Sequence, residues 1–229
     1  MPHHPIPDPA LFDVDAVIFD MDGVVIDSEP LHKRVFQDMA QAIGIHVDDE
    51  EYSRFTGRSP LVQWEHMAAT RSIDRDPQEL AREQVERYLA LVQEPGVAQP
   101  AQGLEGLFDL LEARNLAKAL ASSNDRRVVD TVPGLLGIAH RFQAMVSGED
   151  VAAPKPAPDI FLTAARKLGV DPLRCLVVED ATNGVAAAKA ANMRCIGLAN
   201  PNSGSQDLSA ADLVVPSMAQ LAAALLNRS

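Results

Sequence analysis

The amino-acid sequence predicts an α/β protein built on a doubly wound parallel sheet, with an all-helical domain inserted into it. Two observations lead to this fold class. Short apolar runs typical of buried strands alternate with segments of helical periodicity. One interval, from about Pro30 to Glu94, interrupts the alternation because it contains helical patterns and no convincing strand. With 229 residues, the chain is long enough for one large or two modest domains.

The sheet is predicted from short runs that are apolar throughout. A continuous apolar run, rather than an alternation of apolar and polar residues, indicates a strand that is covered on both faces, as in parallel sheets. In chain order the predicted strands are Ala16–Phe19, Ala117–Ala121, Gln143–Val146, Cys175–Val178, Cys195–Leu198 and Leu213–Val215.

Helices are predicted where apolar residues recur every three or four positions. In the sheet domain these are Leu104–Ala113, Asp125–Val132, Pro158–Leu168, Val185–Ala191 and Met218–Leu226, and in the interval Leu31–Ile43, Leu61–Ala69 and Pro77–Val92. The interval returns to the sheet domain near Pro95-Gly96 and Pro100, a stretch suited to a hinge. We therefore expect an α/β core of residues 1–27 and 97–229 and a helical domain of residues 28–96.

Composition and charge restrict the class of function. The chain is 47% hydrophobic and has no apolar run long enough to cross a bilayer, so we expect no membrane segment. A net charge of −12 without a basic run argues against nucleic acid and against an anionic membrane as partners. Met1 to Pro9 lacks the pattern of a secretory signal, so we expect a cytoplasmic protein, as a monomer or alternatively a dimer.

Cys175 and Cys195 are expected to be reduced structural thiols, with a disulfide as the alternative.

Polar residues follow the predicted strands at the points where those strands end. The carboxyl ends of parallel strands meet at one edge of a sheet, and ligands bind there. The residues concerned are Asp20 and Asp22, Ser122-Ser123-Asn124, Lys155, and Glu179-Asp180. We expect these acids, hydroxyls and one lysine to form a single site.

Asp20 and Asp22 are spaced so that both carboxylates project on the same side of the chain, and Gly23 allows the backbone to turn away. One carboxylate can attack phosphorus to form an aspartyl phosphate while a second gives and takes protons. The alternative is that Asp-x-Asp-Gly is only a turn.

Glu179 and Asp180 add negative charge that such a site cannot hold without a cation. Ligands that are all oxygen, beside a phosphate, suit Mg²⁺. The alternative is that Asp180 is an acid favoured by the following helix N-terminus.

Phosphate binding is predicted at Ser122-Ser123-Asn124, between a strand and a helix, where a hydroxyl and free backbone N–H groups are available. Lys155 lies between Pro154 and Pro156, and its ammonium can neutralise phosphate oxygens. The alternatives are a helix N-cap at Ser123, Asn124 or Asp125 and a solvated loop lysine.

Together these residues resemble the haloacid dehalogenase superfamily, in the branch of β-phosphoglucomutase-like phosphatases with a helical cap. Phe19-Asp20-Met21-Asp22-Gly23-Val24 is similar to its first motif, Ser122 to the second, Lys155 to the third, and Glu179-Asp180 with Asn183-Gly184 to the fourth. The resemblance implies that Asp20 is the nucleophile and Asp22 the general acid/base. It also implies Mg²⁺ held by the Asp20 carboxylate, the Asp22 backbone carbonyl and Asp180, with Glu179 as a further ligand or a supporting group.

The sequence departs from the family pattern in the core and in the cap. Some members have Asp where this chain has Gly184, so the pair of acids before it must supply the charge of the fourth motif. In the cap, His32 and the loop containing Gly57 and Arg58 resemble substrate-reading elements. In the mutases an arginine stands one position after the serine of that loop and a lysine stands near Gln84, whereas here Arg58 precedes the serine.

The resemblance therefore implies a Mg²⁺-dependent phosphatase acting on a small phosphorylated metabolite, such as a sugar phosphate, through a phosphoenzyme at Asp20. The alternative is a phosphosugar mutase that returns the phosphoryl group to a sugar. A binding domain without activity has no need for a nucleophile, an acid/base and metal ligands together. In a dehalogenase, Asp22 would have no function, because a halide leaves without a proton.

Overall fold

The computed structural model describes residues 9–226, so residues 1–8 of the segment examined for a secretory signal lie outside it. Within that range the structure has one parallel sheet of order β3-β2-β1-β4-β5-β6. Its strands are β1 (Ala16–Phe19), β2 (Ala117–Ala121), β3 (Ala144–Val146), β4 (Cys175–Glu179), β5 (Arg194–Leu198) and β6 (Leu213–Val215). The doubly wound parallel sheet is thus confirmed, with β1 in the middle, where Ala16 pairs with Ala117 on one side and Cys175 on the other.

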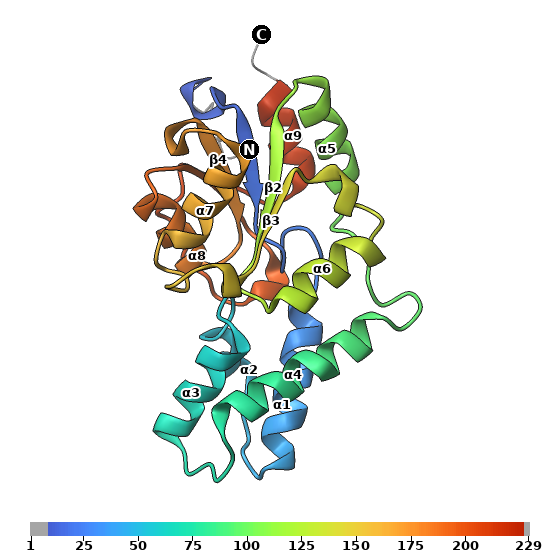
Figure 1. Ribbon diagram of the computed structural model, residues 1–229, viewed down its shortest axis with the longest axis vertical. Coiled ribbons are helices and arrows are strands. Elements are labelled where there is room, and N and C mark those ends of the chain that lie inside the picture. The colour runs from blue at the N-terminus through green and yellow to red at the C-terminus, as the bar shows by residue number, and fades with distance from the viewer. Residues whose placement is uncertain (1–8, 227–229) are drawn as a thin grey trace, which may run out of the picture.

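Helices cover both faces of this sheet (Figure 1). They are α1 (Glu29–Ala42), α2 (Asp49–Ser53), α3 (Pro60–Thr70), α4 (Pro77–Val92), α5 (Leu104–Ala113), α6 (Arg126–Leu135), α7 (Asp159–Leu168), α8 (Thr182–Ala190) and α9 (Met218–Leu226). Short 3₁₀ helices lie at Pro9–Phe12, Ala139–Arg141, Gly148–Asp150, Pro172–Arg174 and Pro201–Ser203. Helices α7 and α8 pack on one face and α5, α6 and α9 on the other.

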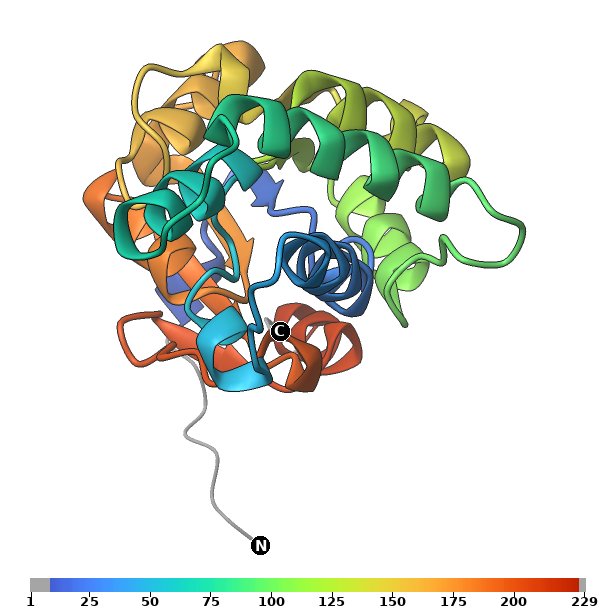
Figure 2. The ribbon, with the colours of Figure 1, turned by 90° about the horizontal axis from the view of Figure 1, so that it is seen from below.

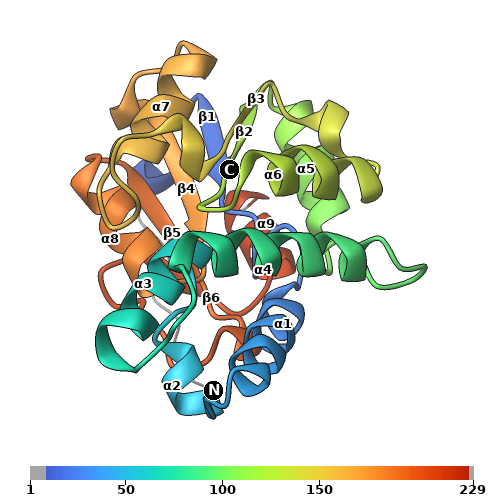
Figure 3. The ribbon, with the colours of Figure 1, turned by 60° about the horizontal axis from the view of Figure 1, so that its bottom comes forward.

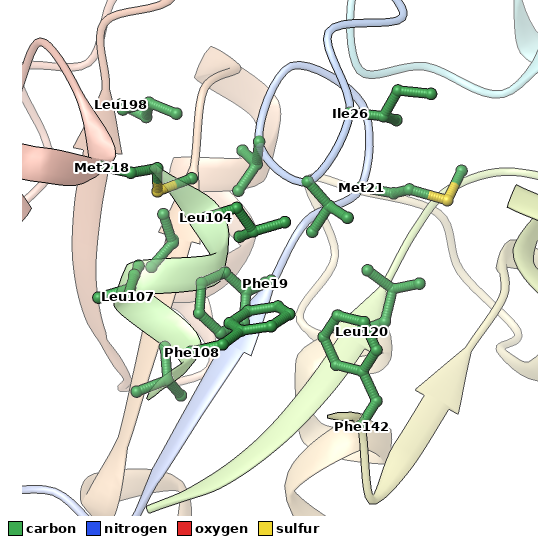
Figure 4. Packing of buried hydrophobic residues seen from close by; sticks show 14 of the residues in the cluster. Phe19, Met21, Ile26, Leu104, Leu107, Phe108, Leu120, Phe142, Leu198 and Met218 are labelled. Atoms are coloured by element: carbon green, nitrogen blue, oxygen red, sulfur yellow. The ribbon is translucent and has the colours of Figure 1, made fainter. Parts of the chain in front are cut away.

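Alternate residues of β1 supply the two core layers. Val17 and Phe19 belong to the cluster packed against α5, α6 and α9, whereas Ala16 and Ile18 belong to the cluster under α7 and α8. In the first cluster the ring of Phe108 lies edge-on to Phe19, with centroids 5.2 Å apart (Figure 4). A strand with apolar residues on both faces is what a sheet covered by helices on both sides requires.

Helices α1–α4 form an inserted cap with a smaller core of its own, centred on Phe36 and Trp64, whose ring centroids are 4.7 Å apart. From below, α1 is seen nearly end-on and α4 crosses beneath the sheet domain (Figure 2). Val85, Tyr88 and Val92 of α4 also pack into the first core cluster, so α4 contacts both parts (Figure 3). The two connections to the cap lie side by side, because Ile26 bridges to Pro100 and Ala101 N–H donates to Val25 C=O at 2.8 Å.

The helices differ from the sequence prediction in one added helix and in several bounds, such as that of α8, which begins at Thr182 and not at Val185. The interval contains a fourth helix, α2, which begins after Asp48, whose side chain accepts a hydrogen bond from Glu51 N–H at 2.8 Å. Its five residues are too few for apolar periodicity to reveal. Helix α6 begins at Arg126, after its N-cap Asp125, and continues past Val132 to Leu135. Pro133 lies in its last turn, where one lost hydrogen bond is tolerated beside a buried valine face.

Both cysteines are buried free thiols in the sheet. Burial raises the pKa of Cys175 to about 12 and raises that of Cys195 further. No helix within residues 9–226 is both long and apolar enough to cross a membrane.

Candidate active site

The structure brings the predicted core residues together at the carboxyl edge of the sheet. Asp20 follows β1, Ser122 follows β2, Glu179 ends β4 and Asp180 follows it. Lys155 arrives from the loop between β3 and α7, 135 residues from Asp20 along the chain. The parallel sheet order places these strand ends beside one another.

Lys155 joins two buried acids of the site, Asp20 and Glu179. Its Nζ donates to Asp20 Oδ1 and, at 2.8 Å, to Glu179 Oε1. Burial raises the pKa of Asp20 to about 8, an effect that Glu179 and Asp22 increase and Lys155 opposes. Burial alone would lower the pKa of Lys155, but the carboxylates of Asp20 and Glu179 together raise it. The lysine is therefore a fixed cation rather than the solvated loop lysine considered above.

Asp22 has a different environment from Asp20. Its Oδ1 accepts from Ser28 Oγ and lies 2.8 Å from His32 Nε2, and its Oδ2 accepts from Asn124 Nδ2 at 2.5 Å. Burial would raise the pKa of Asp22, but the charge and hydrogen bond of His32, with the other two donors, lower it. Correspondingly, burial would lower the pKa of His32, but Asp22 raises it. The ring of His32 stacks on Tyr88 at a centroid distance of 3.9 Å.

The segment after β2 contributes to the site through three consecutive residues. Ser122 Oγ accepts from Asn124 N–H at 3.2 Å, and Asn124 in turn donates to Asp22. Ser123 Oγ donates to Gly57 C=O in the cap at 3.3 Å. The N-cap of α6 is Asp125, whose side chain accepts from Arg127 N–H at 2.8 Å. Ser123 and Asn124 are thus free of the capping role that the sequence left open.

The two acids of the fourth motif, Glu179 and Asp180, are tightly packed against neighbouring segments. Asp180 is buried and its Oδ2 accepts from Ser203 Oγ. Gly23, with φ +72°, approaches so closely that a Cβ there would overlap the Asp180 carboxylate. A Cβ at Gly184 would likewise overlap the Glu179 carboxylate, whose Oε2 accepts from Ala181 N–H at 2.7 Å. The Glu179 side chain thus fills the space in which an acid at position 184 would lie.

The three cap residues predicted to bind substrate line a cavity shared with Asp20 and Asp22. They are His32, Gly57 and Arg58, and Ser123 and Asn124 of the core also line it. The cavity volume is about 30 Å³, whereas sites for small organic ligands usually measure roughly 300–1,000 Å³. Gly57 C=O also accepts from Asn183 Nδ2 at 3.0 Å, so the cap is closed onto the core here.

Sequence reasoning missed a buried chain of side-chain amides in the cap. Trp64 Nε1 donates to Gln84 Oε1 at 2.7 Å, Gln84 Nε2 donates to Gln63 Oε1 at 2.9 Å, and Gln63 Nε2 donates to Arg58 C=O at 3.2 Å. We call these three side chains the amide relay. It connects α3 and α4 to the loop that carries Arg58. The residues are 20 positions apart at the first bond and 21 at the second, so no local pattern indicates them.

The donors at this edge suit a Mg²⁺ ion. The carboxylates of Asp20 and Asp180 and the Asp22 backbone carbonyl are oxygen donors, and Mg²⁺ is usually bound through one or two carboxylates with waters and substrate phosphate. Burial raises the pKa of Asp180, as it does that of Asp20, and the Glu179 carboxylate raises both further, so a bound cation would favour the ionised forms of these acids. In the described part of the chain, no three Asp, Glu, His or Cys side chains are arranged as a metal cage. Both oxygens of Glu179 are hydrogen-bonded, which favours its supporting role.

A family model for haloacid dehalogenase-like hydrolases matches residues 14–192 of this chain. The chain belongs to the haloacid dehalogenase-like hydrolase family. The matched range runs from just before β1 to just past α8 and includes Asp20, Asp22, Ser122, Lys155, Glu179 and Asp180. The resemblance and the hydrolase class expected from the sequence are thus confirmed.

Three curated proteins with different names are similar to this chain over most of its length. SUPPRESSOR OF QUENCHING 1, a chloroplastic protein of Arabidopsis thaliana, is 38% identical over 82% of this chain, which covers 17% of that longer protein. Hexitol phosphatase B of Escherichia coli is 32% identical over 84% of this chain and 83% of its own length. A beta-phosphoglucomutase of Bacillus subtilis is 33% identical over 95% of this chain and 92% of its own.

Solved structures share the whole architecture, cap included. CbbY from Rhodobacter sphaeroides in complex with phosphate has a TM-score of 0.83 and 28% identity, and the match covers 93% of this chain and 99% of that one. A second CbbY structure, a mutant in complex with xylulose-(1,5)bisphosphate, has a TM-score of 0.84 and 27% identity over the same shares. The predicted fold class, a sheet core with an inserted helical cap, is confirmed, whereas the domain boundaries at residues 28 and 96 stay a prediction.

Proposed function

We propose that this protein is a Mg²⁺-dependent phosphatase that hydrolyses a small sugar phosphate through an aspartyl phosphate on Asp20. The observation that carries the proposal is the contrast between Asp20 and Asp22. Asp20 contacts the fixed cation Lys155, while Asp22 is held by Ser28, His32 and Asn124. Two carboxylates at one strand end with different hydrogen-bond partners are suited to two different roles in one reaction.

Asp20 is the nucleophile in this proposal. Lys155 orients its carboxylate and neutralises charge on the phosphate, and the hydroxyl of Ser122, which accepts from Asn124 N–H, can donate its proton to a phosphate oxygen. Bound Mg²⁺ would be held by Asp20, Asp180 and the Asp22 carbonyl, and would neutralise charge and orient the phosphate for in-line attack.

Asp22 handles the protons. Asp22 raises the pKa of His32 and His32 lowers that of Asp22, and the two side chains meet with His32 Nε2 2.8 Å from Asp22 Oδ1. The pair supplies a proton to the leaving oxygen in the first step. In the second step Asp22 takes a proton from the water that attacks the phosphoenzyme, a contribution typically of about 10²–10⁴-fold in rate.

The cap favours a phosphatase over a mutase. Gln84 stands near the position of the mutase lysine, and it is 1% exposed with its amide bonded to Trp64 and Gln63. It therefore has no charge for the second phosphate of a bisphosphorylated intermediate. The similarity to a beta-phosphoglucomutase over 95% of the chain keeps the mutase as the second candidate.

Relatives support the substrate class. Their names include a hexitol phosphatase and a fructose-1-phosphate phosphatase, and a neighbouring structure contains xylulose-(1,5)bisphosphate. We propose a small phosphorylated sugar or polyol for this chain also. Phosphate release and isomerised sugar phosphate, measured in the same reactions, separate the phosphatase from the mutase.

Rapid-quench trapping with an activated aryl phosphate tests the two carboxylates. Asp20→Asn should remove both the phosphoenzyme and turnover, because no group remains to accept the phosphoryl group. Asp22→Asn should still form the phosphoenzyme, since an aryl oxide leaves without a proton, and the intermediate should accumulate for lack of a base. Phosphate mapped to Asp22, to a serine or to a histidine would overturn the assignment.

A further inference from the structure

One buried acid at the cavity has no role in the proposed reaction. Glu29, the first residue of α1, is 4% exposed and lines the cavity with Asp22 and His32. Within residues 9–226, no protein group donates a hydrogen bond to its carboxylate or forms an ion pair with it. Burial raises the pKa of Glu29 to about 7, with a smaller opposing effect of His32.

A purely structural role does not account for this carboxylate. An acid in the first turn of a helix stabilises it electrostatically, but a solvated carboxylate does so without the cost of desolvation. His32, one turn further along α1, directs its Nε2 to Asp22 and not to Glu29. The helix N-cap, Ser28, also donates to Asp22. The carboxylate oxygens of Glu29 thus line the cavity without a donor from residues 9–226, and burial makes the negative charge of Glu29 unfavourable there.

On the basis of the proposed function, we propose that Glu29 determines specificity by accepting a hydrogen bond from a hydroxyl on the carbon next to the phosphorylated carbon of the substrate. The same carboxylate rejects esters that carry a negative group at that carbon. The substrate class is then a polyol or sugar phosphate with a free vicinal hydroxyl, and excludes phosphorylated hydroxy acids of the phosphoglycolate type.

The helical spacing of α1 places Glu29 close to His32. Residues three apart on a helix share a face, with roughly 5–6 Å between their Cβ atoms, so Glu29 and His32 lie side by side in the cavity wall. His32 contacts Asp22, which meets the ester oxygen in the proposed reaction. The first polar group of the leaving alcohol beyond that oxygen is the hydroxyl of the adjacent carbon. Glu29 is therefore placed beside it.

Three esters of two carbons isolate this position. The carbon next to the phosphorylated one bears a hydroxyl in 2-hydroxyethyl phosphate, is a methyl group in ethyl phosphate and is the carboxylate carbon itself in phosphoglycolate. For the wild-type protein with Mg²⁺ at about pH 8, where Glu29 with its pKa of about 7 is mostly ionised, kcat/KM for 2-hydroxyethyl phosphate should exceed that for ethyl phosphate by about 10- to 100-fold, the usual range for a hydrogen bond to a charged group. Phosphoglycolate should be slower still. Esters that turn over slowly are compared as competitive inhibitors of aryl phosphate hydrolysis.

Glu29→Gln keeps the shape and removes the charge. Its preference for the hydroxyl should shrink, and phosphoglycolate should gain about tenfold or more relative to ethyl phosphate, because a repelled carboxylate now meets an N–H donor. Glu29→Asp keeps the charge but withdraws it by one methylene, so the hydroxyl preference should fall while phosphoglycolate stays excluded. Glu65→Gln, at an exposed position in α3, is the matched control and should leave the order of the esters unchanged.

Equal turnover of 2-hydroxyethyl and ethyl phosphate by the wild type, or an unchanged order of esters in both Glu29 variants, would overturn the role of Glu29. Thermal unfolding of each variant shows whether it is folded, and the two variants provide independent tests. Trapping of the Asp20 phosphoenzyme from an aryl phosphate is measured in parallel. If that intermediate forms but the esters are not distinguished, this inference fails and the proposed function stands, whereas no intermediate on Asp20 contradicts the proposed function itself.

Discussion

Replacement of Gln84 by leucine should destabilise the cap, and the contacts of the amide relay determine by how much. The change leaves the buried Trp64 N–H and Gln63 Oε1 without their partners at 2.7 and 2.9 Å. Each unsatisfied buried group costs about 1–3 kcal/mol, or about 2–6 kcal/mol for both. Burial of the leucine side chain returns about 1 kcal/mol, so we expect a net loss near 3 kcal/mol.

Trp64 provides the assay for this prediction, because it is the only tryptophan of the chain and lies in the cap core. Urea unfolding followed by its fluorescence should show the loss for Gln84→Leu. Gln78→Leu, at an exposed position on the same helix, is the matched control and should change little. The double variant with Gln63→Leu should lose less than the sum of the single changes, since both remove the same bond. A loss below about 0.5 kcal/mol for Gln84→Leu would refute the role given to the relay.

Three further predictions concern the metal, the thiols and a surface acid. Activity should disappear in chelator and return with Mg²⁺, and full turnover by metal-stripped protein would contradict the site described above. Cys175 and Cys195 should resist a thiol reagent at neutral pH in the folded protein and react on unfolding, because burial raises both pKa values; rapid reaction of the native protein would refute this. Burial would raise the pKa of Asp150, but Arg126 and Lys167 lower it to about 2, so its contribution to stability is present above the unfolded value of about 3.9 and is lost as the pH falls through 2. The difference in unfolding free energy between wild type and Asp150→Asn should therefore shrink between about pH 5 and pH 2, and a difference that grows in acid would contradict the pairing.

Most of the sheet core could be predicted from the sequence because its signals are local. The first strand, Ala16–Phe19, and the helix Leu104–Ala113 have the predicted bounds, since an apolar run or an amphipathic face is complete within a few residues. The strand ends also predicted which polar residues gather, because parallel strands share one edge. Prediction was weaker where an element is short, as for α2, or where burial holds a helix past a proline, as for α6.

The inner part of the site could not be predicted in the same way. Asn124 bonds to Asp22 across 102 residues, and Gln84 to Trp64 across 20, and neither bond leaves a local pattern in the sequence. Only its burial, and the lack of a donor among residues 9–226, distinguish Glu29 from an ordinary acid at the start of a helix. Which partner a polar side chain finds depends on packing between distant segments, and this information is absent from spacing alone.

The adjacent connections of the cap have a consequence for how such enzymes diversify. Because Ile26 and Pro100 are bridged to each other, both chain connections between the helical insertion and the sheet domain lie at one place. A gene segment exchanged between these two positions would replace the cap residues that are proposed to read the substrate and leave Asp20, Lys155 and Asp180 in their registers. Ser28 and His32, which hold Asp22, lie within the same segment, so a new cap must also supply these two contacts. The cap is therefore an evolutionary module whose first helical turn belongs to the active site.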